Sequence, residues 1–201
     1  MAGSESRMAN RKSRTVKLEK PTLFAVGGIP GVGKSTVAKQ IATTFKIKRF
    51  TTDNLKLAKQ FRRLTAPYRK SGAMFPPSLR RRFYRQLADW GETELRRGRS
   101  VVLDATFSNA KLRSVVYRLV KVTNVRPMLI EIIKGELKDA AMISRMRRRH
   151  RADHRATPPM VYLTYYRYHA PFPRDWHRIS NDGTKAELKK KVTDLLKKTL
   201  W

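Results

Sequence analysis

The sequence predicts an α/β fold in which helices cover both faces of a mostly parallel, five-stranded sheet. Two observations lead to this fold class. Short apolar runs alternate along the chain with segments whose apolar residues recur at helical spacing. Strands that alternate with helices form a parallel sheet, because each helix returns the chain to the same edge. The length of 201 residues fits one domain with a tail.

The expected strands are short, and turn and capping residues separate them from the helices. We expect strands at residues 22–26, 49–52, 100–104, 127–133 and 176–180. We expect helices at 35–45, from 53 onward, from Pro76 or Pro77 to Gly98, at 110–121, from about 137 through an arginine run, and from Pro158 or Pro159. A last helix, 185–200, is basic and amphipathic, with inward-facing Leu188, Val192, Leu195 and Leu196.

Residues 1 to about 20 are polar and basic and show no apolar periodicity, which indicates a flexible basic arm before a domain of residues 21–201. The arm lacks the apolar segment of a secretory signal. Its serines and arginines leave a mitochondrial transit peptide open, although Glu5 and Glu19 are atypical of one. We therefore expect a cytoplasmic protein, with a mitochondrial one as the alternative.

The charge balance is unusual, because 46 Lys and Arg residues face 15 Asp and Glu residues, for a formal net charge of +31. Such a field attracts polyanions and makes their binding salt-dependent. We expect nucleic acid as a partner, RNA above all, although a generally basic proteome would also produce the excess. No membrane partner is expected, since no long apolar stretch is present. The chain has no cysteine, which excludes disulfides, thiolate metal sites and cysteine nucleophiles.

Residues 28–35, Gly-Ile-Pro-Gly-Val-Gly-Lys-Ser, match the phosphate-binding P-loop pattern. A predicted strand precedes the motif and a predicted helix follows it. Its glycines let the backbone approach phosphates, and N–H groups at the helix start bind negative charge. We expect ATP or GTP with Mg²⁺, with the Lys34 amine on the phosphates and the Ser35 hydroxyl on the metal. The expected nucleotide contacts are Gly28, Gly31, Val32, Gly33, Lys34, Ser35 and Thr36.

Two aspartates follow predicted strands at the edge of the sheet where the P-loop lies. Asp104 ends the third strand, where a carboxylate can orient Mg²⁺ together with Ser35. Asp53 follows the second strand, where a carboxylate can accept the proton of an attacking hydroxyl. Each aspartate could instead cap the helix that follows it, and the sequence leaves both alternatives open.

Four segments together resemble a group of P-loop kinases that includes polynucleotide 5′-hydroxyl kinase, phosphoseryl-tRNA kinase, chloramphenicol phosphotransferase and zeta-toxin-like kinases. The segments are the P-loop, Thr52-Asp53, Val101 to Phe107 and the arginine-rich segment after the fourth strand. The resemblance covers residues 22–180. It implies a five-stranded parallel sheet of the nucleoside-kinase type with a small, helical, arginine-rich lid at about 138–160. In place of LDATF at 103–107, polynucleotide kinases and phosphoseryl-tRNA kinase tend to carry Asp-Asp-Thr-Asn.

The resemblance also implies roles for single residues. Asp53 matches the base that activates the acceptor hydroxyl in this group. Lys56 stands where members often carry an arginine, and we expect it to contact substrate. Arg113 matches an arginine after the third strand that often contacts substrate or phosphate.

The lid implied by the resemblance would bring arginines to the nucleotide. Arg145 and Arg149 lie one helical turn apart and can point inward together, where they would neutralise charge on the transferred phosphoryl group. Arg148 is the further nucleotide contact that we expect. The alternative for the whole segment is a solvated basic face.

Kinases of this architecture place the acceptor between the second and third strands, and here that region mixes basic with aromatic residues. The set comprises Arg62, Arg63, Arg69, Lys70, Arg80, Arg81, Arg82, Arg85, Tyr68, Phe75, Phe83 and Tyr84. It suits phosphates and stacked bases, with Arg81 as a substrate contact, but the aromatic residues could equally be core and the arginines solvated. A second aromatic stretch, 162–172, is expected to be at least half core, with Tyr165 or Tyr168 open to base stacking.

These observations favour a Mg²⁺- and ATP-dependent kinase that phosphorylates a hydroxyl on, or attached to, a nucleic acid. A small-molecule kinase is the nearest alternative. An RNA-binding component of a ribonucleoprotein that retains a kinase fold is another, because the net charge, the basic arm and the basic last helix would suit it equally.

Overall fold

The computed structural model describes residues 18–71, 73–134, 139–152 and 159–200. Within them, five strands form one parallel sheet in the order β2-β3-β1-β4-β5. The strands are β1 (Thr22–Gly27), β2 (Lys48–Thr51), β3 (Val101–Asp104), β4 (Arg126–Ile133) and β5 (His177–Ser180). The predicted α/β fold is confirmed, and the predicted strands agree with the observed ones to within one residue at either end.

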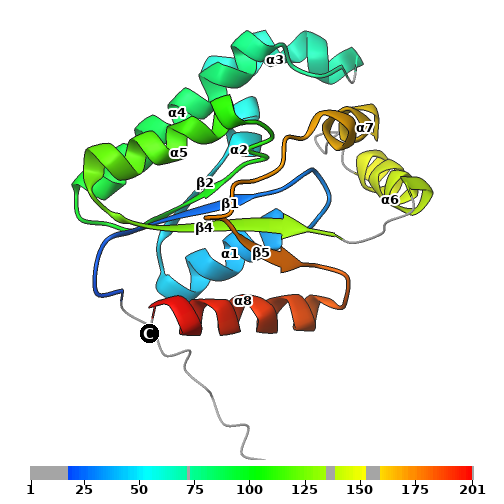
Figure 1. The fold of residues 1–201 in the computed structure, drawn as a ribbon. Coiled ribbons are helices and arrows are strands. Elements are labelled where there is room, and N and C mark those ends of the chain that lie inside the picture. Colours follow the sequence, from blue (N-terminus) through cyan, green and yellow to red (C-terminus); the bar gives the residue numbers. More distant parts are fainter. Residues whose placement is uncertain (1–17, 72, 135–138, 153–158, 201) are drawn as a thin grey trace, which may run out of the picture.

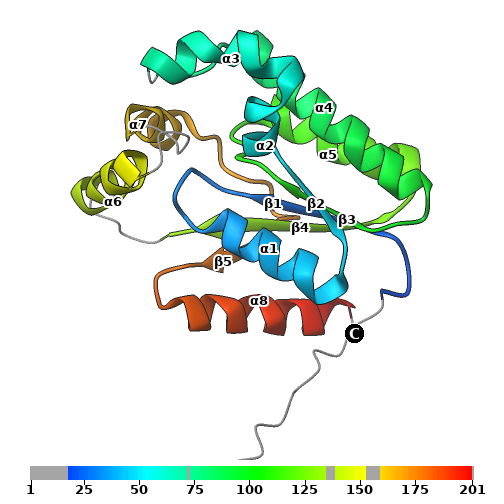
Figure 2. The same cartoon turned by 180° about the vertical axis from the view of Figure 1, so that it is seen from behind.

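Helices cover both faces of the sheet, as Figure 1 and Figure 2 show from opposite sides. On one face lie α1 (Lys34–Phe45) and α8 (Lys185–Leu200), and on the other lie α4 (Pro77–Arg96) and α5 (Ala110–Thr123). Toward the edge where the strands end lie α2 (Thr52–Leu57), α3 (Lys59–Ser71), α6 (Asp139–Ala152) and α7 (Pro159–Tyr168). The edge that the sequence predicts for the site is therefore framed by helices.

β1 is the central strand, and its alternating side chains join the two halves of the core. Leu23 and Ala25 pack with residues of α4 and α5, whereas Phe24 and Val26 pack with residues of α1 and α8. All four side chains are fully buried. Burial of a side chain the size of leucine or phenylalanine stabilises the fold by about 1.5 to 3 kcal/mol. The loop that follows β1 therefore starts from a position fixed on both faces.

Most helix ends are where the local signals predict them. α4 begins with Pro77 in its first turn, and the chain leaves it at Gly98, which has a φ of 70°. The single helix predicted from Asp53 onward is wrong in one respect, because the chain breaks at Ala58 into α2 and α3. The break leaves the Lys56 carbonyl without a helical partner, and the Thr65 hydroxyl donates a hydrogen bond to it at 3.0 Å.

The lid predicted at about 138–160 overlaps α6 and the first residues of α7, and these two helices contact each other through the buried side chains of Met146 and Tyr162. Ile29 of the P-loop packs against the same pair, so the lid and the loop share a small apolar cluster. The arm before residue 18, the start of the lid and residues 153–158 lie outside the described residues. Among the helices that the structure describes, we find none that is both long and apolar enough to cross a membrane.

Candidate active site

The P-loop connects β1 to α1 and is shaped by glycines in the left-handed region. Gly28, Gly31 and Gly33 have φ angles of 131°, 89° and 105°. A Cβ atom on Gly28 would lie 2.4 Å from the Ile132 carbonyl oxygen of the neighbouring strand β4. Backbone angle and space therefore both require glycine at this position.

Asn181, just after β5, holds the loop from outside. Its side-chain amide donates a hydrogen bond to the Val32 carbonyl oxygen at 2.7 Å, and its backbone N–H donates one to Ile133 at 2.9 Å. A Cβ atom on Gly33 would lie 2.5 Å from the same amide nitrogen. The sequence does not predict this contact, because no local pattern links residues that are 149 positions apart.

Lys34, Ser35 and Thr36 form the first turn of α1, where backbone N–H groups and the helix dipole favour an anion. The Lys34 amine donates a hydrogen bond to the Ile29 carbonyl oxygen at 3.3 Å, so it lies over the loop that would surround the phosphates. This arrangement is the one that the P-loop pattern predicts.

Asp104 ends β3 between β1 and β2, and its side chain is buried. One carboxylate oxygen pairs with the Arg49 guanidinium at 2.8 Å. Burial raises the pKa of Asp104 above its ordinary value. The amine of Lys34 and a hydrogen bond from Ser35 lower that pKa, and the carboxylate of Asp53 raises it. The carboxylate therefore lies within electrostatic reach of both the P-loop and the second aspartate.

The alternative for Asp104 as a helix cap is wrong, because Asn109 caps α5. The Asn109 side chain accepts a hydrogen bond from the Leu112 N–H at 3.0 Å. Asp104 is thus separated from helix α5 by residues 105–109, which leaves its carboxylate at the end of the strand.

Asp53 lies in the first turn of α2, and Thr51 caps that helix instead of it. The Thr51 hydroxyl accepts a hydrogen bond from the Asp53 N–H at 3.2 Å. The Asp53 side chain is 65% exposed and pairs with the Lys56 amine at 2.6 Å. Burial of Lys56 works to lower its pKa, but the attraction to Asp53 outweighs it, so that the pKa of Lys56 is raised. Asp53 is therefore a solvent-accessible carboxylate beside a permanent cation.

The oxygen donors at this edge fit Mg²⁺. Ser35 supplies a hydroxyl and Asp104 a carboxylate, and the two are joined by a hydrogen bond. Mg²⁺ prefers hard oxygen ligands and is usually held by one or two protein groups together with water and substrate phosphates. No group of three or more His, Cys, Asp or Glu side chains suited to a metal occurs in the described part of the chain, so no all-protein cage is found there.

Arg113, predicted to contact substrate, is buried and used by the fold. Its guanidinium donates hydrogen bonds to the carbonyl oxygens of Phe107 at 2.9 Å, Ala170 at 3.2 Å and Pro171 at 3.0 Å. It also lies over the Phe172 ring, 4.8 Å from the centroid. This geometry favours a structural role, in which Arg113 joins α5 to the segment before β5, over the predicted substrate contact.

The predicted lid arginines lie on α6. Arg145 and Arg149 are one turn apart on its backbone, but their side chains lie outside the described part of the structure. Arg148 is exposed. The roles given to these arginines therefore stay predictions.

The aromatic residues of the acceptor region divide between core and edge. Phe83 and Tyr84 are buried core residues, so the hypothesis that they stack on bases is wrong. Phe75 is partly buried and packs against both Tyr68 and Phe83. By contrast Arg81 is exposed, as a substrate contact requires.

The second aromatic stretch is mixed in the way the sequence predicts. Tyr162 and Phe172 are buried, whereas Tyr168 is 77% exposed. Tyr165 is covered by the Arg80 guanidinium, 5.2 Å from the ring centroid. Arg80 also donates a hydrogen bond to the Ser108 hydroxyl at 2.8 Å, which positions it near the loop after β3.

His169 lies at the candidate active site, although no sequence pattern pointed to it. Its ring stacks on Phe172 with a centroid distance of 5.2 Å, and the next residue, Ala170, donates a backbone hydrogen bond to Ser108 at 2.9 Å. Burial lowers the pKa of His169 to about 4, with further lowering by the cations Arg113 and Lys34. A neutral imidazole therefore lies within electrostatic reach of the P-loop lysine at neutral pH.

The fold is shared with solved kinase structures. A gluconokinase from Sinorhizobium meliloti matches at a TM-score of 0.65 and 14% identity over 92% of this chain and 95% of that one. The APS kinase CysC from Mycobacterium tuberculosis, in complex with AMPPNP and APS, matches at 0.59 and 19% over 90% and 99%. Kti12 from Chaetomium thermophilum, in complex with ADP-AlF3, matches at 0.63 and 15% over 90% and 100%. Identities this low show the fold alone.

A family assignment comes from the sequence itself. No curated protein sequence matches the chain. The family model described as AAA domain, AAA_33, matches residues 23–170, which contain the P-loop, both aspartates and the predicted lid segment. This match covers more than half of the 201 residues, and the chain therefore belongs to the AAA_33 family of AAA domains.

Proposed function

We propose that this protein is a kinase that transfers the γ-phosphoryl group of Mg²⁺-ATP to a hydroxyl on, or attached to, a nucleic acid, with RNA favoured. The observation that carries the proposal is the meeting of two carboxylates with the P-loop. Asp104 pairs in register with Val26, at the end of the strand that leads into the P-loop, and with Thr51, two residues before Asp53. Its pKa responds to the charges of both Lys34 and Asp53. Phosphoryl transfer needs these groups together: a cation for the phosphates, an oxygen donor for the metal and a base for the acceptor.

Each residue then has one task. Asp53 accepts the proton of the acceptor hydroxyl. The oxygen of that hydroxyl bonds to the γ-phosphorus, while the bond from that phosphorus to the β-phosphate oxygen breaks. Lys34 attracts the charge on the phosphate oxygens, and Ser35 and Asp104 would hold Mg²⁺, which neutralises charge on the nucleotide when bound. Arg145 and Arg149 would add positive charge from the lid. Lys56 pairs with Asp53 at 2.6 Å and would hold its carboxylate in place beside the acceptor.

The acceptor is proposed from charge. Two exposed arginines, Arg62 and Arg63, lie on α3, which follows Asp53 in the chain, and the exposed Arg82 lies on α4. The protein carries a net charge of +31. A small metabolite does not need so wide a positive field, whereas a phosphate backbone spans it.

A small-molecule kinase is the second candidate, and the structural neighbours favour it. The matched chains include a sugar kinase, a gluconokinase and an APS kinase. The two candidates differ in a simple property. Transfer to a nucleic acid should weaken steeply as salt rises, whereas transfer to a sugar in a compact site should change little.

The test is a transfer assay with γ-labelled ATP and Mg²⁺ that offers total RNA, DNA oligonucleotides and a metabolite pool as separate acceptors. Asp53→Asn is the catalytic variant, and Asp194→Asn, an exposed aspartate on the distant α8, is its matched control. We expect label in RNA with the wild type and the control, and about a hundred- to ten-thousand-fold less with Asp53→Asn.

Three results would contradict the proposal in different ways. Label only in the metabolite pool supports the small-molecule kinase. RNA binding that survives Lys34→Ala, with no label in any acceptor, supports a ribonucleoprotein component that retains the fold. Equal transfer by Asp53→Asn and the wild type removes Asp53 as the base.

A further inference from the structure

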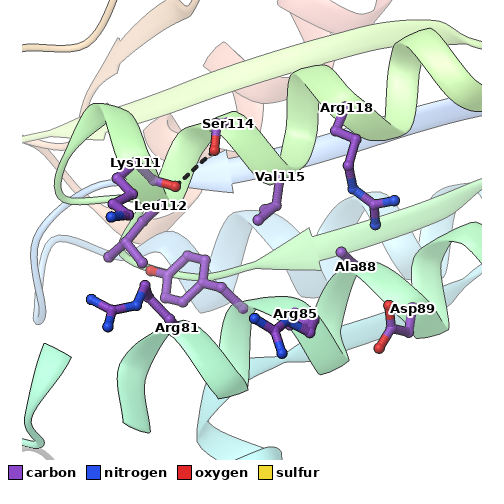
Figure 3. A pocket seen from close by; sticks show the side chains of 10 residues that line it. Arg81, Arg85, Ala88, Asp89, Lys111, Leu112, Ser114, Val115 and Arg118 are labelled. Atoms are coloured by element: carbon purple, nitrogen blue, oxygen red, sulfur yellow. Dashed lines mark hydrogen bonds between the residues drawn. The ribbon is translucent and has the colours of Figure 1, made fainter. Parts of the chain in front are cut away.

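A groove runs between the outer sides of α4 and α5, and four of the ten residues that line it are cations. Figure 3 shows Arg81 and Arg85 along α4, and Lys111 and Arg118 along α5. The groove encloses about 420 Å³. Asp89 is the only acidic residue among those that line it.

Three of the four cations take part in no ion pair within the described residues. Arg81, Arg85 and Lys111 are exposed and take part in none of the ion pairs found there, while Arg118 pairs with Glu92 at 3.4 Å. Arg81 and Arg85 are also one helical turn apart, and like charges at that spacing repel by a few tenths of a kcal/mol. An anion that lies between the helices would remove this repulsion, so the cluster is chemically suited to a ligand of several negative charges.

The groove opens at the same edge as the active site. α5 starts shortly after β3 ends at Asp104, and α4 runs toward the beginning of β3, so both helices begin at the carboxyl-terminal edge of the sheet. Lys111 lies in the first turn of α5, and Arg81 is the fifth residue of α4. A direct link exists as well, because Tyr84, on the groove wall, accepts a hydrogen bond from the Phe107 N–H at 2.8 Å. Phe107 lies on the loop that follows Asp104.

Between the cations, the floor of the groove is apolar. Ala88, Leu112 and Val115 line it together with the edge of Tyr84. A free inorganic anion gains nothing from such a floor. A sugar–phosphate backbone does, since it presents phosphates to the cations and the carbon face of its sugars to the floor.

We propose that this α4–α5 groove binds the sugar–phosphate backbone of the acceptor nucleic acid, on the side that leads away from the reacting hydroxyl. The proposal rests on the nucleic-acid acceptor proposed above and gives that acceptor a path over the protein. The groove then fixes the position of the nucleic-acid strand, while the residues at the carboxyl-terminal edge of the β-sheet act on the hydroxyl of that nucleic acid.

The test measures binding and transfer separately. The groove variant is Arg81→Gln/Arg85→Gln/Lys111→Gln, and its control is Lys185→Gln/Lys189→Gln/Lys190→Gln, which removes the same charge from exposed positions on α8. Binding of a short, labelled, single-stranded RNA is followed by fluorescence anisotropy over a series of salt concentrations. A DNA strand of the same sequence and a poly-glutamate chain serve as competitors.

Each phosphate contact to a single strand contributes about 0.7 to the slope of log affinity against log salt. We therefore expect the groove variant to lose about 2 from that slope and about a hundred-fold in affinity at about 0.1 M salt, while the control loses far less. Thermal melting of both variants should equal that of the wild type, because the substituted side chains are exposed. Equal losses in the two variants, or poly-glutamate that competes as well as RNA, would overturn the proposal.

Transfer of label separates this proposal from the proposed function. If the groove variant binds RNA weakly and no protein form transfers phosphate, the groove stands and the kinase proposal fails. If transfer to RNA has the same KM in the groove variant as in the wild type, the kinase proposal stands and the groove fails. Both stand if the groove variant raises the KM for RNA and leaves the KM for ATP unchanged. If DNA competes as strongly as RNA, the groove recognises the phosphates that both nucleic acids share.

Discussion

The P-loop side of the candidate site and its acceptor side are built in different ways. On the P-loop side, backbone conformation and buried partners fix the groups: Gly28 faces a carbonyl oxygen of β4, and the buried Asp104 pairs with Arg49 at 2.8 Å. On the acceptor side, Asp53 is 65% exposed and pairs with Lys56, and Arg62, Arg63 and Arg82 face solvent.

This difference shows which part of the proposed function depends on the fold. The packed side is the part that low-identity kinases can share, because its geometry follows from the sheet and the loop. The exposed side depends on side chains that the core does not constrain, so it can be adapted to a different acceptor. Substitutions should therefore separate the two sides, with stability affected mainly on the first and substrate use mainly on the second.

The largest expected effect compares the two aspartates. Asp104→Asn and Asp53→Asn should each reduce phosphoryl transfer by about a hundred- to a thousand-fold, because one removes the proposed metal ligand and the other the proposed base. Only Asp104→Asn should also lower the melting temperature, since it leaves the guanidinium of Arg49 without its charge partner. A transfer assay and thermal melting check this. Equal shifts in melting temperature for the two variants would show that the sides are not built differently.

A second comparison uses two arginines. Arg113→Gln should cost about 3 kcal/mol of stability, because one buried and two partly buried carbonyl oxygens lose a charged donor. Arg81→Gln should change stability by less than about 0.5 kcal/mol, because its side chain is exposed. Urea unfolding measures both. If Arg113→Gln folds as stably as the wild type but raises the KM for substrate, the substrate contact predicted from the sequence is right and the structural role is wrong.

A third comparison uses two glycines with positive φ angles. Gly28→Ala should cost about 2 kcal/mol and abolish nucleotide binding, because the added methyl group would lie 2.4 Å from a carbonyl oxygen and force the loop to move. Gly98→Ala, at a φ of 70° with open space around it, should cost about 1 kcal/mol and leave nucleotide binding unchanged. Calorimetric titration with ATP and thermal melting distinguish the two. Normal ATP binding by Gly28→Ala would contradict the geometry of the loop.

The smallest expected effect lies away from the site. Hydrogen bonds from Arg99 and Lys48 lower the pKa of Glu94 from 4.5 to about 2. A carboxyl group with a lowered pKa in the folded state stabilises it above the unfolded pKa, and this contribution is lost as the pH falls through the folded value. The difference in melting temperature between the wild type and Glu94→Gln should therefore be constant above about pH 4.5 and shrink toward pH 2. The exposed Asp89→Asn is the control, and a difference that grows on acidification would refute the ion pairs.

The sequence by itself determined the features that depend on local chemistry. The P-loop pattern located the phosphate site, and turn and cap residues such as Pro77 and Gly98 located helix ends that the structure confirms. Apolar runs predicted β1, β3 and β4, because a strand buried on both faces needs a continuous apolar segment. Asp53 and Asp104 were identified as candidates because each stands at or just after the end of a predicted strand.

Only the tertiary structure decided which side chains meet across the chain. Arg49 and Asp104 are 55 residues apart, and Arg113 binds carbonyl oxygens 57 and 58 residues away. The tertiary structure also places Phe83 and Tyr84 in the core and Arg81 at the groove, whereas the sequence left both arrangements open. The physical reason is that local periodicity gives one helix a face, but burial and pairing depend on which other element packs against that face. The phosphate site was therefore readable from eight adjacent residues, whereas the partners that hold Asp104, Arg113 and the P-loop were not.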